Sequence, residues 1–382
     1  MNICISRNAE ARTNAAIARV TNALNDEANK IILLTRNRFA DAKRRINIVN
    51  YKTANSTILN YEISIKSQPG KGITNIFQLL HFQIIAFTWF IKNRDKFDVV
   101  HAFDLDVGLP VYLLSKIAKK KYVYHIADFY IDSRGNVPSI LKPLIRRLEY
   151  LVINRATATI ICTEDRESQI EGSKPKNLTV IHNTPSVPKE MVDILSFKDE
   201  ISSDDNSNLT LTYVGALSEK RFIKSAIEII KDIPNITLHI AGMGTLTEYA
   251  KDMSSKYTNI NFHGMVDYKE ALKLYSKTDL MFALYDPGVP NHKYSAPNKV
   301  YEAMMLGKPI IVAKNTGMDK IVKDNEMGLI INYSEKEFKN LLFSILDKSI
   351  NLEELGTNAK RAYQNYSWCE MKERLVNLYK KI

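Results

Sequence analysis

Short apolar strands alternate with helical segments along most of the chain, and this alternation limits the fold more than any other feature. The strand-like runs are NICIS, KIILLTR, DVVHAF, KYVYHIA, ATATIICT and LTVIHN in the first half, and LTLTYVG, ITLHIAG, INFHG, DLMFAL and PIIVA in the second. Strands that alternate with helices indicate βαβ units and parallel sheets. We therefore predict an α/β fold with two Rossmann-like domains that face each other across a cleft, with ligands at the carboxyl ends of the strands.

Length and charge both divide the chain. A single core rarely grows beyond about 250–300 residues, and this chain has 382. The net charge of +11 is concentrated in residues 1–195, where 28 Lys and Arg stand against 18 Asp and Glu, whereas the remainder has 25 against 24. We predict a first domain over 1–195, a polar linker over 196–207, a second domain over 208–365, and a C-terminal helix over 366–382 that packs back on the first domain.

Cysteine usage and hydropathy indicate a compartment. Cys4, Cys162 and Cys369 form no C-x-x-C pair, which indicates neither a zinc site nor a disulfide framework. The chain begins with a strand-like run instead of a signal peptide, and the longest apolar run, residues 77–91, is too short to span a bilayer. We therefore expect a cytoplasmic protein.

Three strand-to-helix turns of the second half have features that suit an anion. Lys220 and Arg221 follow the strand LTLTYV and its terminal Gly215, Gly242 and Gly244 follow ITLHIA, and Lys299 opens the helix in YSAPNKVYEAMMLGKPII. Helix N-termini present free N–H groups and partial positive charge, which favour phosphate. A G-x-G by itself is also a common tight turn, and Asn298 suits a cap or a turn. The coincidence of these features nevertheless predicts a diphosphate site.

The helix of residues 297–306 carries two residues that a purely structural helix does not need. We expect Pro297 at its first position and Gly307 just after its end. Lys299 places a cation at the positive end of the helix dipole, and Glu302 places a carboxylate among apolar residues. The two residues either form a routine i,i+3 contact of about 0.2–0.5 kcal/mol, or hold a phosphate and a ribose diol.

The chain resembles two-domain glycosyltransferases of the GT-B fold, closest to glycosyltransferase family 4. The segments that carry the resemblance are YVGALSEKRFIKSAIEI, HIAGMGT, FHGMV, YSKTDLMFALYDP and APNKVYEAMMLGKPIIVAKNTGMDKIV. It implies that the first domain binds the acceptor and the second a nucleotide sugar. Arg221 and Lys299 would hold the donor diphosphate, Glu302 its ribose, and Gly317 would bring backbone amides near the phosphates or sugar.

The sequence departs from the family pattern at three places. Tyr294 stands where the acidic motif has its first Glu, which usually contacts the donor sugar. Ala216 stands where an Arg usually follows the strand-end glycine, and ISRNAEARTN replaces the N-terminal glycine-rich loop. Within that segment, Arg12 resembles an Arg of branches that build bacterial surface polysaccharides, and the PNK pattern indicates the same branches.

Several first-half residues are candidates for contact with the sugar or acceptor. We expect His101, His125 and Asp128 at strand ends that point into the cleft, with His125 and Asp128 as catalytic candidates beside Arg221 and Lys299. The Asp-x-Asp that contains Asp104 is interpreted as a loop on the acceptor side, with no metal.

Two basic segments of the first half, SKIAKKKYVY and ILKPLIRRLEYLVINR, suggest a membrane partner. The second has helical apolar spacing, typical either of an ordinary core helix or of a helix that lies on anionic lipid. A lipid-diphosphate-linked glycan acceptor would suit the lipid interpretation, with the protein peripheral at the inner face of the membrane.

Together these features predict a hexosyltransferase-type enzyme of cell-surface polysaccharide or capsule biosynthesis. We expect anomeric retention and neither a metal nor another cofactor besides the nucleotide-diphosphate sugar donor. The alternatives are a nucleotide-sugar epimerase on the same fold, a non-catalytic scaffold, and a basic nucleic-acid-binding protein. No nucleic-acid recognition motif is visible, so we expect no nucleic-acid partner.

Overall fold

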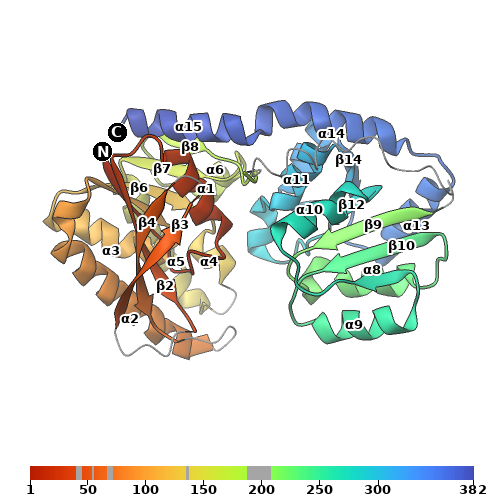
Figure 1. The fold of residues 1–382 in the computed structure, drawn as a ribbon, viewed down its shortest axis with the longest axis horizontal. Helices are drawn as coiled ribbons and strands as arrows, with labels where there is room; N and C mark the ends of the chain where they lie inside the picture. Colours follow the sequence, from red (N-terminus) through yellow and green to blue (C-terminus); the bar gives the residue numbers. More distant parts are fainter. Residues whose placement is uncertain (40–44, 54–55, 67–71, 135–136, 187–207) are drawn as a thin grey trace. The chain divides into compact units, whose positions relative to one another are not determined.

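The computed structural model describes residues 1–39, 45–53, 56–66, 72–134, 137–186 and 208–382 (Figure 1). The chain divides into two compact units, Met1–His182 with Met371–Ile382, and Asn183–Glu370. The boundary predicted at residue 195 and the linker predicted over 196–207 lie outside the described residues.

A sheet of eight strands forms the centre of the first unit, in the order β3-β4-β2-β1-β5-β6-β7-β8. The pairing of β3 with β4 is antiparallel and the other pairings are parallel. The strands are β1 (Asn2–Ser6), β2 (Lys30–Asn37), β3 (Ile46–Lys52), β4 (Thr57–Ser64), β5 (Val99–Phe103), β6 (Lys121–Ile126), β7 (Ala158–Ile161) and β8 (Leu178–Val180). The direction of strand addition reverses between β1 and β5, so their carboxyl ends mark the switch point where such sheets bind ligands.

Helices cover both faces of this sheet. They are α1 (Ala15–Leu24), α2 (Gly72–Lys92), η1 (Arg94–Lys96), α3 (Asp104–Ile117), α4 (Tyr130–Ser133), η2 (Ser139–Leu141), α5 (Lys142–Arg155) and α6 (Arg166–Gln169). Right-handed crossovers place α2, α3 and α5 on one face and α1 on the other, because the chain moves along the sheet in opposite directions through them. Pairwise packing of α2 with α3 and of α3 with α5 agrees with this arrangement.

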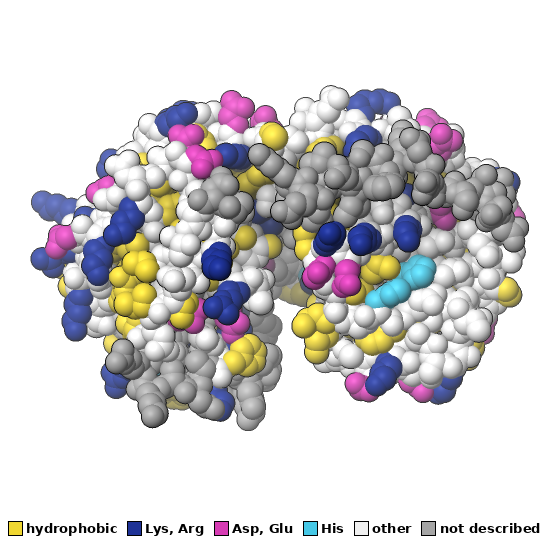
Figure 2. Space-filling view, in the orientation of Figure 1, with side chains coloured by type: hydrophobic (Ala, Val, Ile, Leu, Met, Phe, Trp, Pro, Cys, Tyr) yellow, Lys and Arg dark blue, Asp and Glu magenta, His cyan; other side chains and the backbone are white. Residues whose placement is uncertain are grey.

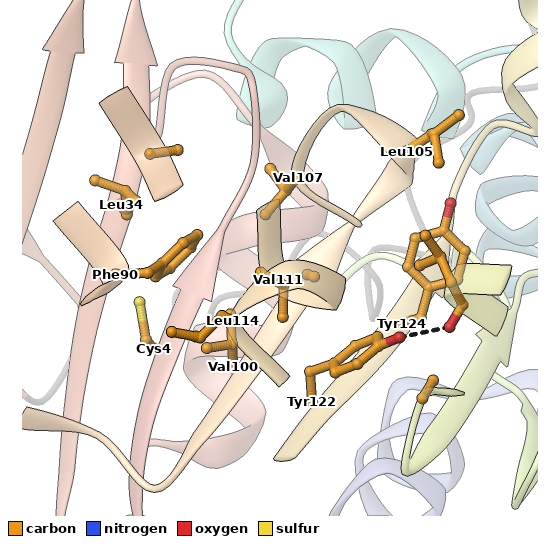
Figure 3. Packing of buried hydrophobic residues seen from close by; sticks show 14 of the residues in the cluster. Cys4, Leu34, Phe90, Val100, Leu105, Val107, Val111, Leu114, Tyr122 and Tyr124 are labelled. Carbon is orange, nitrogen blue, oxygen red and sulfur yellow. Dashed lines mark hydrogen bonds between the residues drawn. The ribbon is translucent and has the colours of Figure 1, made fainter. Parts of the chain in front are cut away.

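Apolar side chains of the strands and of α2 and α3 fill the core of the first unit (Figure 3). Phe90 of α2 and Leu114 of α3 lie near Cys4 of β1. The hydroxyl of Tyr122 donates to the carbonyl oxygen of Val152 at 2.6 Å, so the buried polar atom has a partner.

The second unit contains a six-stranded parallel sheet in the order β11-β10-β9-β12-β13-β14. Its strands are β9 (Leu209–Val214), β10 (Ile236–Ala241), β11 (Ile260–Phe262), β12 (Leu280–Ala283), β13 (Ile310–Ala313) and β14 (Gly328–Ile331). Its helices are η4 (Glu219–Arg221), α8 (Ile223–Ile230), α9 (Thr247–Lys256), α10 (Tyr268–Ser276), η5 (Pro290–Tyr294), α11 (Asn298–Leu306), α12 (Met318–Asp324), α13 (Glu335–Leu346) and α14 (Leu352–Tyr366). Buried strands such as β12 and β13 are apolar throughout because helices cover both of their faces.

Helix α11 begins one residue later than predicted. Pro297 is its N-cap, with φ −69° and ψ 144°, and Asn298 is its first residue. Gly307 ends the helix with φ 64°, a left-handed conformation that favours glycine. Lys299 therefore lies in the first turn, as expected, and Glu302 lies one turn further along.

The last helix, α15 (Trp368–Lys380), begins in the second unit and belongs to the first unit from Met371 onward. Within the first unit, the sulfur of Met371 accepts a hydrogen bond from the backbone N–H of His182 at 3.1 Å. Across the described residues, no helix has both the length and the hydropathy to cross a membrane.

Candidate functional site

The candidate site lies at the switch point of the second sheet. The chain adds β10 and β11 on one side of β9, and β12, β13 and β14 on the other. The carboxyl ends of β9 and β12 therefore border the crevice in which such sheets bind ligands. Gly215 follows β9, Tyr285 follows β12, and α11 brings Lys299 and Glu302 to the same edge.

Lys299 is a buried cation. The residue is 8% exposed, and its Nζ lies 4.4 Å from the centre of the Tyr213 ring. Gly215 leaves the space that this ammonium needs, because a Cβ there would come within 2.7 Å of Nζ. Burial acts to lower the pKa of Lys299, but nearby oxygens, chiefly that of Tyr213, raise it above its ordinary value. The ammonium is therefore charged at neutral pH.

Arg221 supplies a second cation. Its Cζ lies 3.6 Å from the centre of the Tyr285 ring, and the residue ends η4 instead of opening α8. Phe222 follows with φ 62°, a conformation that costs a bulky residue about 1–3 kcal/mol. Its ring packs against Tyr333 and Phe338, and this packing stabilises the turn that directs Arg221 toward Tyr285. The charge of Arg221 also acts on the pKa of Lys299, which indicates that the two cations are neighbours.

Lys220 has a different environment. Its exposed Nζ forms an ion pair with Asp286 Oδ2 at 2.8 Å, and this contact raises the pKa of Lys220. The backbone N–H of Asp286 in turn donates to the carbonyl oxygen of Lys220 at 3.1 Å. Lys220 thus connects η4 to the segment after β12, and its charge is balanced by Asp286.

The glycines of the G-x-G turn are explained by backbone packing inside the unit. A Cβ on Gly242 would lie 1.9 Å from the carbonyl oxygen of Gly215, and a Cβ on Gly244 would lie 2.0 Å from that of Leu217. The N–H of Leu217 donates to the carbonyl oxygen of Met243 at 3.0 Å, so the two strand-end loops run side by side. This packing requires glycine at both positions, whether or not a ligand approaches the same backbone.

Glu302 is buried at the same edge. Burial and then the charge of Glu302 raise the pKa of Tyr275, so the two residues lie within electrostatic range of each other. The hydroxyl of Tyr275 donates to the carbonyl oxygen of Val214 and accepts from its N–H, each at 3.2 Å. Since Val214 is the last residue of β9, Glu302 lies close to the carboxyl end of that strand.

Tyr294 and Gly317 are brought together nearby. Gly317 caps α12 with φ 72°, and a Cβ there would lie 3.3 Å from the Cα of Tyr294. A carboxylate already lies in the first turn of α12, where Asp319 accepts the backbone N–H of Asn315 at 2.8 Å. Asn298, half-buried, opens the neighbouring helix α11.

The structure corrects the prediction that His101 contacts the acceptor. Its side chain is completely buried, with Nδ1 2.8 Å from the hydroxyl of Tyr379 and Nε2 3.0 Å from Nδ1 of His125. Burial lowers the pKa of His101 to about 3, so the ring is neutral. A sugar cannot reach it, because it lies within β5 and not at the end of that strand.

His125 is the next member of this hydrogen-bonded chain. It lies near the end of β6, and burial, followed by His101, lowers its pKa well below the ordinary value. The residue is also buried, at 5% exposed, and its Nδ1 is bonded to His101, so only Nε2 could contact another group. His101 and Tyr379 therefore orient the imidazole of His125.

The structure also corrects the interpretation of the Asp-x-Asp as a loop, because residues 104–106 form the first turn of α3. Asp104 pairs with Arg7 at 3.2 Å, and its Oδ1 accepts the N–H groups of Ala127 and Asp128 at 2.9 and 3.0 Å. Burial raises the pKa of Asp104, and Arg7 opposes this effect. Asp104 thus connects α3 to the segment after β6. The side chain of Asp128 is half exposed, with Oδ1 4.0 Å from Nη2 of Arg166.

Arg12 lies apart from this cluster. It is exposed and lines a hollow of the surface together with Asn50, Tyr51 and Lys52 of β3. Among the described residues, no group of three or more His, Cys, Asp or Glu side chains is arranged to hold a metal ion.

Four residues of these clusters were not predicted from the sequence. Tyr213 and Tyr285 support the two cations of the second unit. Arg7 pairs with Asp104, and Arg134 pairs with Asp106 at 3.0 Å in the first unit. Only the position of the two tyrosines in the sequence could have indicated them, since both stand at the carboxyl ends of strands.

Comparison with known proteins is consistent with this geometry. Residues 196–362 match the family described as glycosyl transferases group 1. An uncharacterized glycosyltransferase of Methanocaldococcus jannaschii is 24% identical over 312 residues, which are 76% of this chain and 77% of that protein. The Escherichia coli UDP-Gal:alpha-D-GlcNAc-diphosphoundecaprenol alpha-1,3-galactosyltransferase is 22% identical over 308 residues, 76% of each chain.

A solved structure shows the same architecture. Anabaena HepE in complex with UDP-glucose superposes with a TM-score of 0.67 at 15% identity, and the match covers 100% of both chains. The prediction of two Rossmann-like domains of the GT-B type is thereby confirmed at the level of the fold. Together with the match of residues 196–362, these similarities support a glycosyltransferase of GT-B fold.

Proposed function

We propose that the protein transfers a hexosyl group from a nucleotide-diphosphate sugar to a glycan or a lipid-diphosphate-linked glycan. The observation that carries this proposal is the cluster at the switch point of the second sheet. Two neighbouring cations, Arg221 and Lys299, lie with the buried carboxylate Glu302 beside the backbone of Gly215. A diphosphate balances two positive charges, and a carboxylate accepts the two hydroxyls of a ribose.

The same residues would stabilise the leaving group. As the glycosidic bond to the nucleotide breaks, negative charge develops on the β-phosphate, and fixed cations near it lower the barrier. Arg221 and Lys299 are both held against aromatic rings, so little reorganisation is needed when that charge appears. We propose that these cations replace a metal ion and that the sugar keeps its anomeric configuration.

The remaining donor contacts are proposed from their positions. The backbone of Gly215, Gly242 and Gly244 would approach the phosphates from the strand ends. Tyr294 and Gly317, whose backbones lie close to each other, would lie toward the sugar, with Asn298 at the start of α11. Lys220 would contribute only if a ligand displaces Asp286 from it.

The acceptor is proposed to bind the first unit. His125, oriented by His101, and the half-exposed Asp128 are the candidates for contact with the reacting hydroxyl. Arg12 and Lys52, in the hollow beside β3, would suit an anionic part of the acceptor. The similarity to a galactosyltransferase named for a diphosphoundecaprenol-linked substrate supports a lipid-linked acceptor. We therefore propose a role in cell-surface polysaccharide biosynthesis at the cytoplasmic face of the membrane.

Calorimetric titration against UDP, GDP, ADP, CDP and dTDP tests the donor assignment. UDP is the first probe because both a relative and a structural neighbour are named for UDP-sugars. We expect one diphosphate to bind and the Glu302→Gln variant to bind it more weakly. The absence of binding by all five would contradict the proposal. Conversion of a nucleotide sugar to its epimer without acceptor would replace it with an epimerase.

A further inference from the structure

Helices α2, α3 and α5 expose an unusual amount of apolar surface. Of the seventeen large hydrophobic side chains that are exposed among the described residues, ten lie on α2, on α3 or on η2 and α5. These helices pack side by side in that order on one face of the first sheet, so the side chains belong to one surface. We refer to the outward side chains of α2, α3, η2 and α5 as the α2–α3–α5 surface.

The apolar positions form stripes along each helix. On α2, Phe77, Leu80 and Ile84 are separated by three and four residues, and Ile84 is 64% exposed. This spacing places side chains on one side of a helix. This outward stripe is additional to the core side of α2, where Phe82, Ile85 and Phe90 are buried.

The other two helices continue the surface. Leu113 and Ile117, four residues apart on α3, are 47% and 67% exposed. On η2 and α5, Ile140, Leu144 and Leu151 follow one side of the helix, and Leu144 is 57% exposed. Contiguous apolar patches of this kind mark sites of interaction with a protein or a membrane.

Cations border the apolar side chains. The only charged residue of α2 is Lys92. Beyond its first turn, α3 has Lys116 alone, and α5 carries Lys142, Arg146, Arg147 and Arg155. The one acid of α5, Glu149, is completely buried and accepts the hydroxyl of Tyr124 at 2.8 Å. The outward faces therefore combine apolar and positively charged side chains. Figure 2 shows hydrophobic side chains among Lys and Arg side chains on the first unit.

We propose that the α2–α3–α5 surface rests on an anionic lipid bilayer. Its composition is that of helices that lie in the interface, where apolar side chains enter the acyl boundary and cations contact lipid phosphates. A symmetric contact with a second copy is disfavoured, because it would place Lys116, Arg146 and Arg147 against the same cations of the copy. The inference deepens the proposed function by giving the surface through which the enzyme reaches a lipid-linked acceptor, but vesicle binding does not require the donor site.

Co-sedimentation with vesicles tests this assignment. The full chain is mixed with vesicles of phosphatidylcholine alone or with phosphatidylglycerol, at low and high salt. One variant removes apolar contact on all three helices: Ile84→Ser, Leu113→Ser and Leu144→Ser. A second removes charge: Lys116→Gln, Arg146→Gln and Arg147→Gln. The matched control changes an exposed site of α13 in the second unit: Lys336→Gln, Lys339→Gln and Phe343→Ser.

We expect the wild type and the α13 control to bind the anionic vesicles and not phosphatidylcholine alone. Each Lys or Arg near an anionic surface contributes about 1 kcal/mol, or about five-fold in partitioning. The charge variant should therefore bind at least about ten-fold more weakly, and high salt should weaken the wild type. The apolar variant should lose at least as much, because complete burial of one Leu or Ile side chain contributes about 1.5–3 kcal/mol. Equal vesicle binding by the surface variants, or no binding by the wild type, would overturn the proposal. So would a wild-type dimer that the variants convert to monomer, because the surface would then join two copies.

Calorimetric titration with UDP and thermal melts are run on every variant. Unchanged melting shows that a loss of vesicle binding does not come from unfolding. Unchanged UDP affinity with lost vesicle binding separates the surface from the donor site. Failure of the wild type to bind any nucleotide would contradict the proposed function. The comparison of vesicle binding between wild type and variants would still test the α2–α3–α5 surface.

Discussion

The Lys299→Met substitution separates a diphosphate site from a structural helix contact. Methionine retains most of the apolar length of the buried side chain but removes the ammonium that lies 4.4 Å from the Tyr213 ring. A charge-assisted hydrogen bond contributes roughly 1.5–3 kcal/mol, so the affinity for a nucleoside diphosphate should fall about 10- to 100-fold. The affinity for the bare nucleoside should change little, because Lys299 is assigned to the phosphates.

The assay is calorimetric titration with UDP and with uridine, or with the diphosphate and nucleoside that the initial panel selects. Lys308→Met is the matched control, since it changes a partly buried lysine just beyond the opposite end of the same helix. The raised pKa of Lys299 also predicts that its contribution persists from pH 7 to 9. Unchanged diphosphate affinity in Lys299→Met, or equal losses for nucleoside and diphosphate, would refute the assignment of Lys299 to the phosphates.

Three further substitutions test the environment of the two clusters. Gly242→Ala places a Cβ 1.9 Å from a backbone oxygen and should destabilise the protein by more than about 2 kcal/mol. The control Gly264→Ala, at φ 68° with no atom within 4 Å of the new Cβ, should cost about 1 kcal/mol. Equal urea midpoints for the two variants would contradict this prediction. Tyr379→Phe leaves the buried Nδ1 of His101 without its partner and should cost about 1–3 kcal/mol in urea unfolding; an unchanged midpoint would contradict it. Burial raises the pKa of Glu149 to about 8, whereas a Glu in the unfolded chain has a pKa of roughly 4.3. Between these values the folded state binds a proton that the unfolded state does not, so stability falls as pH rises from about 5 to 8. Glu149→Gln should flatten that part of the melting temperature profile, and an unchanged slope would argue against the shift.

Much of the architecture was predictable because buried parallel strands are apolar throughout. The apolar runs around β1, β5, β9, β12 and β13 can be recognised as strands in this way, and their alternation with helices predicts both sheets. Strands β3 and β4 were missed. β3 is an edge strand whose residues are half-buried or exposed, so it has no continuous apolar run.

The cluster that we propose to bind the donor could be located from the sequence where charge and local structure conflict. A cation in the first turn of α11 and a carboxylate on its buried side identified Lys299 and Glu302 from the sequence. The aromatic partners Tyr213 and Tyr285 were not predictable in the same way, because a tyrosine at a strand end is compatible with an ordinary core. Their role depends on contacts between β9, β12 and α11 that only the fold provides.

The first unit shows why strand-end position alone is a weak guide. His101 lies in the middle of β5, where His125 and Tyr379 contact its ring, and Tyr379 lies 278 residues away in the sequence. No local sequence pattern indicates such a contact. Asp104 likewise begins a helix with φ 56°, a left-handed conformation that Asp tolerates and that sequence periodicity does not reveal.

The most direct test of the central claim is a transfer assay with mass-spectrometric detection. The wild type and Glu302→Gln are incubated with UDP-glucose, UDP-galactose or UDP-GlcNAc and with lipid-diphosphate-linked glycans extracted from bacterial membranes, with and without a chelator. We predict that one sugar is added to a glycan while an equal amount of UDP is released, with or without chelator, and that Glu302→Gln is much slower. Transfer that requires a divalent ion would contradict the assignment of leaving-group stabilisation to Arg221 and Lys299. Release of UDP that is equally fast in Glu302→Gln would contradict the donor site itself.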